Sequence, residues 1–148
     1  MRIAFDTNIL AYLAGVDRVA SDGPKIDRSR ATLAALAGRA TLIVPVQALG
    51  ELFVVLVRAG APREAARDIV LRFRQTFAVT DTQETTLLSA LDLVVAHRLQ
   101  LWDSLILSAA ADAGCGMLLS EDMQAGFVWR GVTVLDPLTT AIEDRFTL

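Results

Sequence analysis

The chain has 148 residues, of which 53% are hydrophobic and 21% charged, a composition that excludes intrinsic disorder and can fill a sizeable core. Its single cysteine, Cys115, excludes an internal disulfide and Cys-rich metal sites, and its single histidine, His97, excludes a His-rich zinc site. We therefore expect one domain over residues 1–148, located in the reducing cytoplasm, whose metal or acid–base chemistry relies on carboxylates.

The formal net charge is −3, with thirteen arginines and one lysine, Lys25. A net negative charge disfavours strong nonspecific binding of nucleic acid by the fold alone, so such a role would need a metal or a partner. We expect no targeting segment at the N-terminus, because Asp6 and Asn8 interrupt its apolar run. Residues 40–57 approach the length of a bilayer span but contain proline, glycine and glutamate, which predicts a buried strand and helix and no membrane contact.

Short apolar runs predict strands, and apolar residues spaced three and four apart predict helices. In chain order we predict a strand over 2–5, a helix over 9–13, a loop over 15–27, a helix over 28–37, a strand over 41–44, helices over 45–59 and 62–74, a strand over 77–79, helices over 81–98 and 103–113, strands over 117–120 and 132–135, and a short helical tail. Strands that alternate with helices predict an α/β fold with a central parallel sheet flanked by helices on both faces.

Two local signals refine these boundaries. The segment 15–27 contains the pair Gly23-Pro24 and is predicted to be the long loop and the most mobile part of the chain. Asp81 and Glu84 have the spacing of a capping box, which predicts the start of the helix that follows.

Four carboxylates fall at or near the carboxyl ends of predicted strands, the edge at which parallel α/β sheets bind ligands. Asp6 directly follows the first strand, and Glu51 lies in the helix after the second. Asp103 opens a predicted helix, and Asp122 follows the strand over 117–120. We expect these four side chains to gather at one edge of the sheet.

Such a cluster calls for a cation. Glu51 lies in an apolar helix, where a carboxylate is costly to bury without a partner. Two carboxylates about 5 Å apart repel each other by on the order of 3 kcal/mol at an effective dielectric near 20. A hard, all-oxygen ligand set favours Mg²⁺ or Mn²⁺, which stabilises charge on a phosphate and lowers the pKa of a bound water. The pattern therefore predicts a nuclease or a phosphatase.

Polar neighbours are candidates for supporting roles. We expect Asn8 to orient Asp6 or to contact a phosphate, and Ser104 to support Asp103. Ser120 is expected to hold a water or the nearby aspartate.

Each carboxylate also has a purely structural alternative. Asp6 and Asp103 would be helix N-caps, Asp122 a turn residue, and Glu51 a solvent-facing residue on a half-exposed helix. Four such residues at strand ends are difficult to attribute to coincidence, so we favour a shared site.

Four segments resemble the PIN-domain ribonucleases, and within them the VapC-type toxins of bacterial and archaeal toxin–antitoxin pairs. They are FDTNIL at 5–10, VPVQALGELF at 44–53, LWDSLI at 101–106 and LSEDMQ at 119–124, and their order and spacing match the family over nearly the whole chain. The resemblance implies a single PIN-like domain over 1–148. It also implies a metal-binding quartet and supporting polar residues: Asp6, Glu51, Asp103 and Asp122, with Thr7 or Asn8 and Ser120 in support. The family order of serine or threonine, any residue, aspartate favours Asp122 over Glu121.

The resemblance further implies an endoribonuclease that depends on Mg²⁺ or Mn²⁺ and acts as the toxin of a type II toxin–antitoxin system. Its partners would be an RNA substrate, a second copy in a homodimer, and a small antitoxin whose C-terminal segment lies across the active site. Three alternatives stay open. They are a receiver-like signalling domain with an acidic pocket, which normally needs a late lysine that this chain lacks, a catalytically silent PIN-like binding module, and a nuclease directed at DNA.

Overall fold

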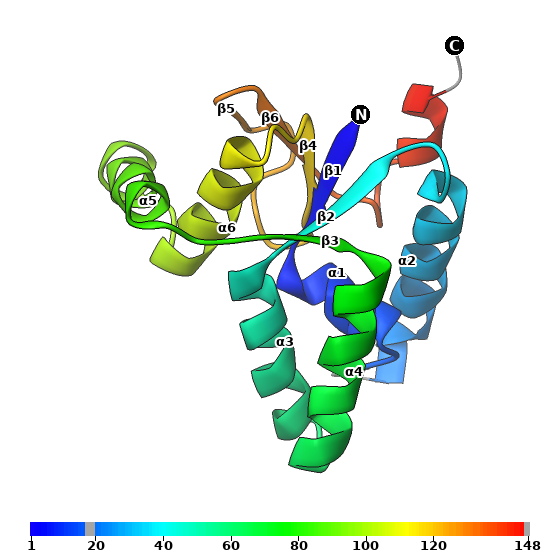
Figure 1. Cartoon of the computed structure of the whole chain (residues 1–148). Helices are drawn as coiled ribbons and strands as arrows, with labels where there is room; N and C mark the ends of the chain where they lie inside the picture. Colours follow the sequence, from blue (N-terminus) through cyan, green and yellow to red (C-terminus); the bar gives the residue numbers. More distant parts are fainter. Residues whose placement is uncertain (17–19, 147–148) are drawn as a thin grey trace.

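The computed structural model describes residues 1–16 and 20–146. Within these ranges, one six-stranded sheet has the order β3-β2-β1-β4-β6-β5 (Figure 1). The strands are β1 (Arg2–Phe5), β2 (Thr41–Pro45), β3 (Ala78–Thr80), β4 (Met117–Leu119), β5 (Val128–Trp129) and β6 (Val132–Leu135). Neighbouring strands are parallel except for the β5–β6 pair, which is antiparallel.

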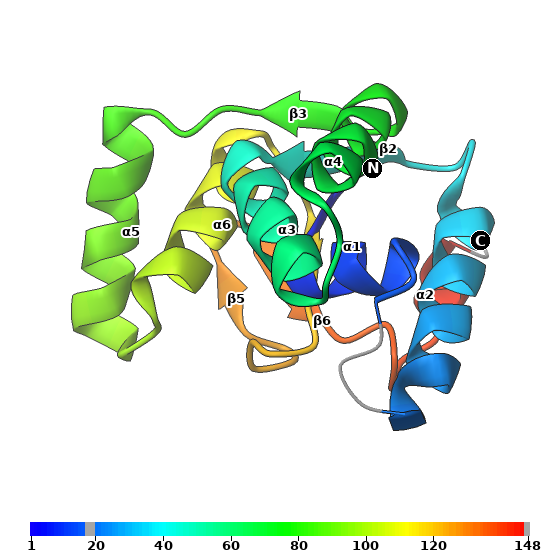
Figure 2. The same ribbon diagram turned by 90° about the horizontal axis from the view of Figure 1, so that it is seen from below.

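Helices cover both faces of this sheet. The α-helices are α1 (Thr7–Leu13), α2 (Gly23–Leu36), α3 (Val46–Arg58), α4 (Arg63–Thr76), α5 (Glu84–His97) and α6 (Leu101–Asp112), with short 3₁₀ helices at Ala20–Asp22 and Ile142–Phe146. Helix α2 lies on one side of the sheet, and the packed pair α5 and α6 lies on the other (Figures 1 and 2). The predicted α/β fold with a mostly parallel, two-sided sheet is therefore confirmed. No helix in the described ranges is both long and apolar enough to cross a membrane.

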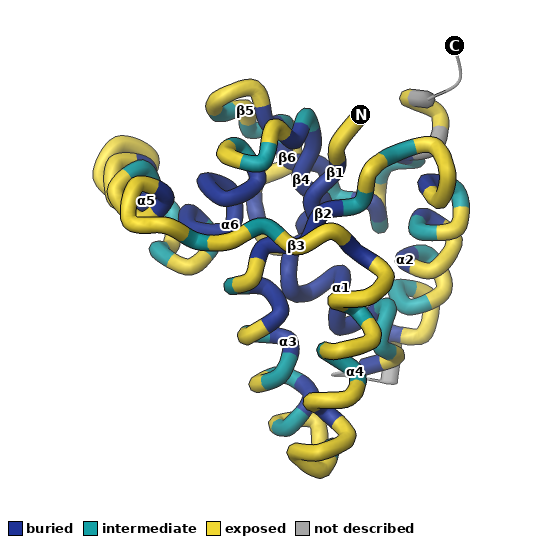
Figure 3. Tube along the Cα trace, viewed as in Figure 1, coloured by how far each residue is buried: buried dark blue, intermediate teal, exposed yellow. Residues whose placement is uncertain are grey.

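The core is centred on β1, the strand that lies between β2 and β4. Ile3, Ala4 and Phe5 are completely buried, and the ring of Phe5 packs edge-on against Phe77 at a centroid distance of 5.1 Å. Figure 3 shows the buried residues concentrated in the central strands, α1 and α6. Residues 3–5 of β1 are a continuous apolar run, as expected for a strand covered on both faces, and the chain direction of β1 places Asp6 at the carboxyl edge.

The predicted loop over 15–27 is wrong in its second half. Helix α2 begins at Gly23, and Pro24 occupies its first turn, where the fixed φ of proline suits a helix and its missing N–H is not needed. Gly15, with a φ of 84°, makes the turn that ends α1. Residues 17–19 of the predicted loop lie outside the described residues.

The start of α5 also differs from the prediction. Its N-cap is Gln83, whose backbone N–H donates to Thr86 Oγ1 at 3.1 Å, so the expected box between Asp81 and Glu84 is wrong. The Thr86 hydroxyl in turn donates to Asp112 Oδ2 at 2.7 Å, which ties α5 to α6.

The antiparallel strand β5 was not predicted. It pairs with β6 through a two-residue turn at Arg130 and Gly131, whose φ values of 47° and 80° are both positive. Two positive φ values are typical of the type I′ hairpin turn, which places glycine or asparagine in such positions. The glycine between two short apolar runs was the sequence signal for this hairpin, although arginine before it weakened that signal.

Candidate active site

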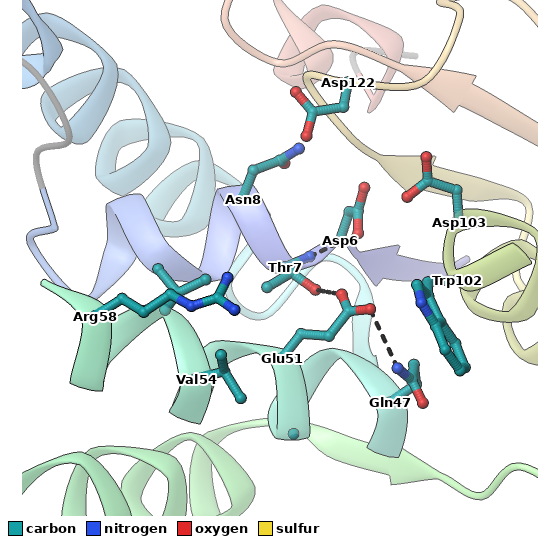
Figure 4. Close-up of a pocket in the computed structure, with 12 residues that line it drawn as sticks. Asp6, Thr7, Asn8, Gln47, Glu51, Val54, Arg58, Trp102, Asp103 and Asp122 are labelled. Carbon is teal, nitrogen blue, oxygen red and sulfur yellow. Dashed lines mark hydrogen bonds between the residues drawn. The ribbon is translucent and has the colours of Figure 1, made fainter. Parts of the chain in front are cut away.

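An open cleft of about 510 Å³ lies where the chain leaves β1, β2 and β4. All four predicted carboxylates line it, and Figure 4 shows them around one space. The lining consists of the carboxylates Asp6, Glu51, Asp103 and Asp122, the polar or charged residues Thr7, Asn8, Gln47 and Arg58, and Gly50, Val54, Val55 and Trp102. The parallel topology therefore brings together residues that are 116 positions apart in the chain, from Asp6 to Asp122.

Asp6 is the most buried of the four carboxylates, with only 3% of its surface exposed. It is the N-cap of α1, and its Oδ1 accepts a hydrogen bond from the backbone N–H of Thr7 at 2.7 Å. Its Oδ2 accepts from the hydroxyl of Ser120, also at 2.7 Å. Burial raises the pKa of Asp6 from 3.8 to about 7, the two hydrogen bonds oppose this rise, and the charges of Asp103 and Glu51 add to it. The structural alternative, in which Asp6 is a helix N-cap, is thus correct, and the same residue also lines the cleft.

Glu51 is half-buried and is held by two neutral donors. Its Oε2 accepts from the Thr7 hydroxyl at 2.6 Å, and its Oε1 accepts from Gln47 Nε2 at 3.1 Å. Gln47 precedes it by one helical turn, a spacing at which side chains on a helix meet. Gln47 was not among the predicted site residues, although its spacing from Glu51 was the available signal.

Asp103 occupies the first turn of α6 but does not cap it. The helix begins at Leu101, with Gln100 as its N-cap, so the structural alternative in which Asp103 is an N-cap is wrong. Partial burial raises the pKa of Asp103, and the charges of Asp122 and Glu51 raise it further. Carboxylates from three different segments therefore act on one another across the cleft.

The supporting residues make contacts that differ from those expected. Ser120 binds Asp6 rather than the nearby aspartate, and its hydroxyl also accepts the backbone N–H of Met123 at 3.2 Å. Asn8 Oδ1 accepts from the backbone N–H of Glu121 at 3.3 Å. Ser104 is completely buried, and its hydroxyl makes no hydrogen bond in the described part of the chain, so its expected support of the neighbouring aspartate is wrong.

Glu121 is directed away from the cleft by two residues from α1 and α2. The Tyr12 hydroxyl donates to Glu121 Oε2, and Lys25 Nζ donates to Glu121 Oε1. Burial raises the pKa of Tyr12 to about 12, and its hydrogen bond to the Glu121 carboxylate adds to this rise. The hydrogen bond to Glu121 also raises the pKa of Lys25. Of the adjacent pair, Asp122 lines the cleft and Glu121 does not.

We expect Lys25→Met to weaken any activity of the cleft severalfold, because Lys25 pairs with Glu121, the direct neighbour of the cleft residue Asp122. The methionine retains an apolar stem but removes one of the two side-chain partners of Glu121, so that only the Tyr12 hydroxyl still holds this carboxylate beside Asp122. Lys25→Arg, which keeps the ion pair, is the control. Initial rates measured over a Mn²⁺ titration would show a higher Mn²⁺ requirement for the methionine variant, and identical titrations for the two variants would contradict this role.

The carboxylates of the cleft are chemically suited to a divalent cation, because they supply hard oxygen ligands and repel one another without one. Among the side chains that the structure describes, however, no three of His, Cys, Asp or Glu lie close enough together to hold a metal ion. Glu51 and Asp6 instead direct their oxygens at Thr7, Gln47 and Ser120. Shared coordination would need a closer approach of the carboxylates.

A family model described as "PIN domain" matches residues 3–125. The chain belongs to the PIN domain family. Its sheet order and its acidic carboxyl edge are those described above. A receiver-like domain would need a lysine at the acidic pocket, but Lys25 binds Glu121 outside the cleft, so this alternative has no support. No curated protein matches the chain in sequence.

Solved structures with a similar fold include the following three. VapC20 of Mycobacterium tuberculosis, described as a sarcin–ricin loop cleaving toxin, aligns with a TM-score of 0.64 at 18% identity, over 81% of this chain and 89% of that one. VapBC2 of Rickettsia felis, bound to a DNA fragment from its promoter, gives a TM-score of 0.69 at 16% identity over 92% and 98%. A toxin–antitoxin complex from Klebsiella pneumoniae gives 0.62 at 20% identity over 91% and 97%.

Proposed function

We propose that this PIN domain is an endoribonuclease that depends on Mg²⁺ or Mn²⁺ and acts as the toxin of a type II toxin–antitoxin system. The observation that carries the proposal is the convergence of four carboxylates on one cleft at the carboxyl edge of the sheet: Asp6, Glu51, Asp103 and Asp122. The description of the similar VapC20 structure as a sarcin–ricin loop cleaving toxin supports RNA as the substrate class.

The four carboxylates would hold the cation. A bound Mg²⁺ or Mn²⁺ supplies a water of lowered pKa and stabilises charge on the phosphate oxygens. Thr7 fixes two of the carboxylates at once, because its N–H binds Asp6 and its hydroxyl binds Glu51. Among the described residues that line the cleft, Arg58 is the one cation, and its guanidinium is suited to a phosphate of the substrate.

We also propose a small antitoxin, a homodimer and a cytoplasmic location. The similar Klebsiella pneumoniae structure is described as a toxin–antitoxin complex, which supports an antitoxin partner. An arginine from such a partner would pair with the carboxylates of the cleft and block it without RNA. Co-expression with a neighbouring small protein, followed by size-exclusion chromatography and an RNA cleavage assay, tests the partner and the dimer together.

The enzymatic proposal predicts that purified protein cleaves RNA with Mg²⁺ or Mn²⁺ and stops when EDTA is added in excess. Re-addition of Mn²⁺ should restore cleavage, because the carboxylates alone provide no electrophile for a phosphodiester. Asp6→Asn protein purified in parallel is the control for contaminating ribonuclease, and gel analysis of end-labelled RNA is the measurement. Cleavage that persists in metal-stripped Asp6→Asn protein would refute the assignment.

A catalytically silent PIN-like binding module is the second candidate. It is favoured by the separation of the carboxylates, of which no three lie at metal-binding distance in the described ranges. Binding of RNA without cleavage at any concentration of Mg²⁺ or Mn²⁺ would select this candidate. A DNA oligonucleotide of the same sequence, tested in the same assay, separates a ribonuclease from a nuclease directed at DNA.

A further inference from the structure

Trp102 is a large aromatic residue that remains exposed inside the cleft. It lies in the first turn of α6, directly before Asp103, and 55% of its surface is accessible. Figure 4 shows its ring at the edge of the cleft, on the side of Asp103 and Gln47. Exposure of a single apolar side chain is ordinary, but among the described residues Trp102 is the one aromatic residue that lines this carboxylate-rich cleft, and aromatic side chains that line a cleft are suited to contact a ligand.

Local packing does not account for this aromatic residue. The residues of α6 that follow Asp103, from Ser104 to Ala110, are all buried, so this helix has a well-filled inner face without the indole. The other tryptophan, Trp129 on β5, has one ring face covered by the guanidinium of Arg130 at 5.2 Å from its centroid. Trp102 has no such ring contact within the residues that the structure describes.

We propose that Trp102 is a stacking platform that holds one nucleobase of the RNA substrate beside Asp103, and this role rests on the proposed ribonuclease function. An indole face binds the π-face of any base, and such a stack typically changes affinity by about 5- to 150-fold per base. Trp102 is therefore a positioning residue that places the adjoining phosphate among the carboxylates.

Arg58 lies at the opposite end of the cleft from Trp102. One wall of the cleft is formed by α3, which carries Gln47, Glu51 and Arg58 over about 16 Å at 1.5 Å per residue. In Figure 4, Arg58 and Trp102 flank the carboxylates from opposite sides. A strand that crosses the cleft would meet the indole, the carboxylates and the guanidinium in turn, which offers a base contact and a phosphate contact on either side of the reacting bond.

The first test reads stacking without relying on cleavage. Trp129→Phe leaves Trp102 as the only tryptophan, and Asp6→Asn in the same chain prevents turnover. We expect a single-stranded oligoribonucleotide to quench the fluorescence of Trp102 saturably in Mg²⁺, whereas an abasic oligomer of the same length does not. Binding measured by anisotropy of labelled RNA, with no change in tryptophan emission, would overturn the proposal.

The second test separates stacking from simple apolar bulk. We expect Trp102→Leu to raise KM for RNA by about 5- to 150-fold with a smaller change in kcat, and Trp102→Phe to restore most of the loss. Trp129→Phe is the matched control, because it changes the tryptophan that lies outside the cleft. Wild-type KM in the leucine variant would overturn the platform while leaving the ribonuclease function intact.

The remaining outcomes are also decisive. If the wild-type protein neither binds nor cleaves RNA, the proposed function fails and the platform fails with it. If Trp102 fluorescence responds to a co-expressed antitoxin but not to RNA, the ring is a protein contact and the platform is wrong.

Discussion

Asp103→Asn is expected to reduce RNA cleavage at saturating Mg²⁺ by at least about a hundredfold. Loss of an outer partner of a metal ligand alone costs about 10- to 100-fold, and this substitution removes a proposed ligand itself. Asparagine has nearly the same volume, and loss of the charge relieves the repulsion from Asp122 and Glu51. The variant should therefore fold, with a melting temperature in metal-free buffer at pH 8 that equals or exceeds that of the wild type.

The matched control is Asp92→Asn, the same chemical change at an exposed position on α5 away from the cleft. Its cleavage rate should equal that of the wild type. Single-turnover rates and thermal unfolding of the two variants give the comparison. A cleavage rate for Asp103→Asn within severalfold of the wild type, or a marked loss of stability without metal, would exclude Asp103 from a shared metal site.

In metal-free buffer, stability is expected to fall as the pH rises from about 4 to about 7. The pKa of Asp6 is about 7 in the folded protein against 3.8 for the ordinary carboxyl, so the folded state binds more protons than the unfolded state in this interval. Stability then decreases with pH, and a pKa difference of this size corresponds to about 4 kcal/mol. The raised pKa of Asp103 acts in the same direction.

A divalent cation should oppose this loss, because it binds the folded protein and favours the ionised carboxylates. At about a hundredfold excess over its dissociation constant, a bound ion contributes about 2.7 kcal/mol. The increase in melting temperature caused by Mn²⁺ should therefore be larger at pH 8 than at pH 5. Asp6→Asn should remove most of the pH dependence, whereas Asp92→Asn should retain it. A metal-free melting temperature that rises between pH 4 and pH 7 would contradict the burial of an ionisable Asp6.

The sequence allowed the sheet and the cleft to be predicted for one physical reason. Strands covered on both faces are apolar runs, so β1 and β2 are visible without an alignment, and parallel strands bring their carboxyl ends to one edge. The sequence alone therefore predicts that the four carboxylates share one edge of the sheet. Their roles as metal ligands stay a prediction.

The errors have equally definite causes. Gly23-Pro24 is typical of both a loop and the first turn of a helix, and only the packing of α2 distinguishes them. The hydrogen bonds of Gln47, Tyr12 and Lys25 depend on side chains that meet after folding, and two of these three involve partners about a hundred positions away. Ser104 follows an active-site candidate directly, yet helical geometry turns it into the core.

The position of Thr7 has a consequence for how the site tolerates change. Thr7 binds two carboxylates, Asp6 through its backbone N–H and Glu51 through its hydroxyl. Asp6 is the N-cap of α1 and Glu51 lies in α3, and these two helices pack against each other. The distance between these two carboxylates is therefore set by the packing of two helices and not by a loop. Truncation of Leu10 or Leu52 in the core would cause small shifts in this helix–helix contact. Such shifts would lower the activity of the site well before they unfold the protein.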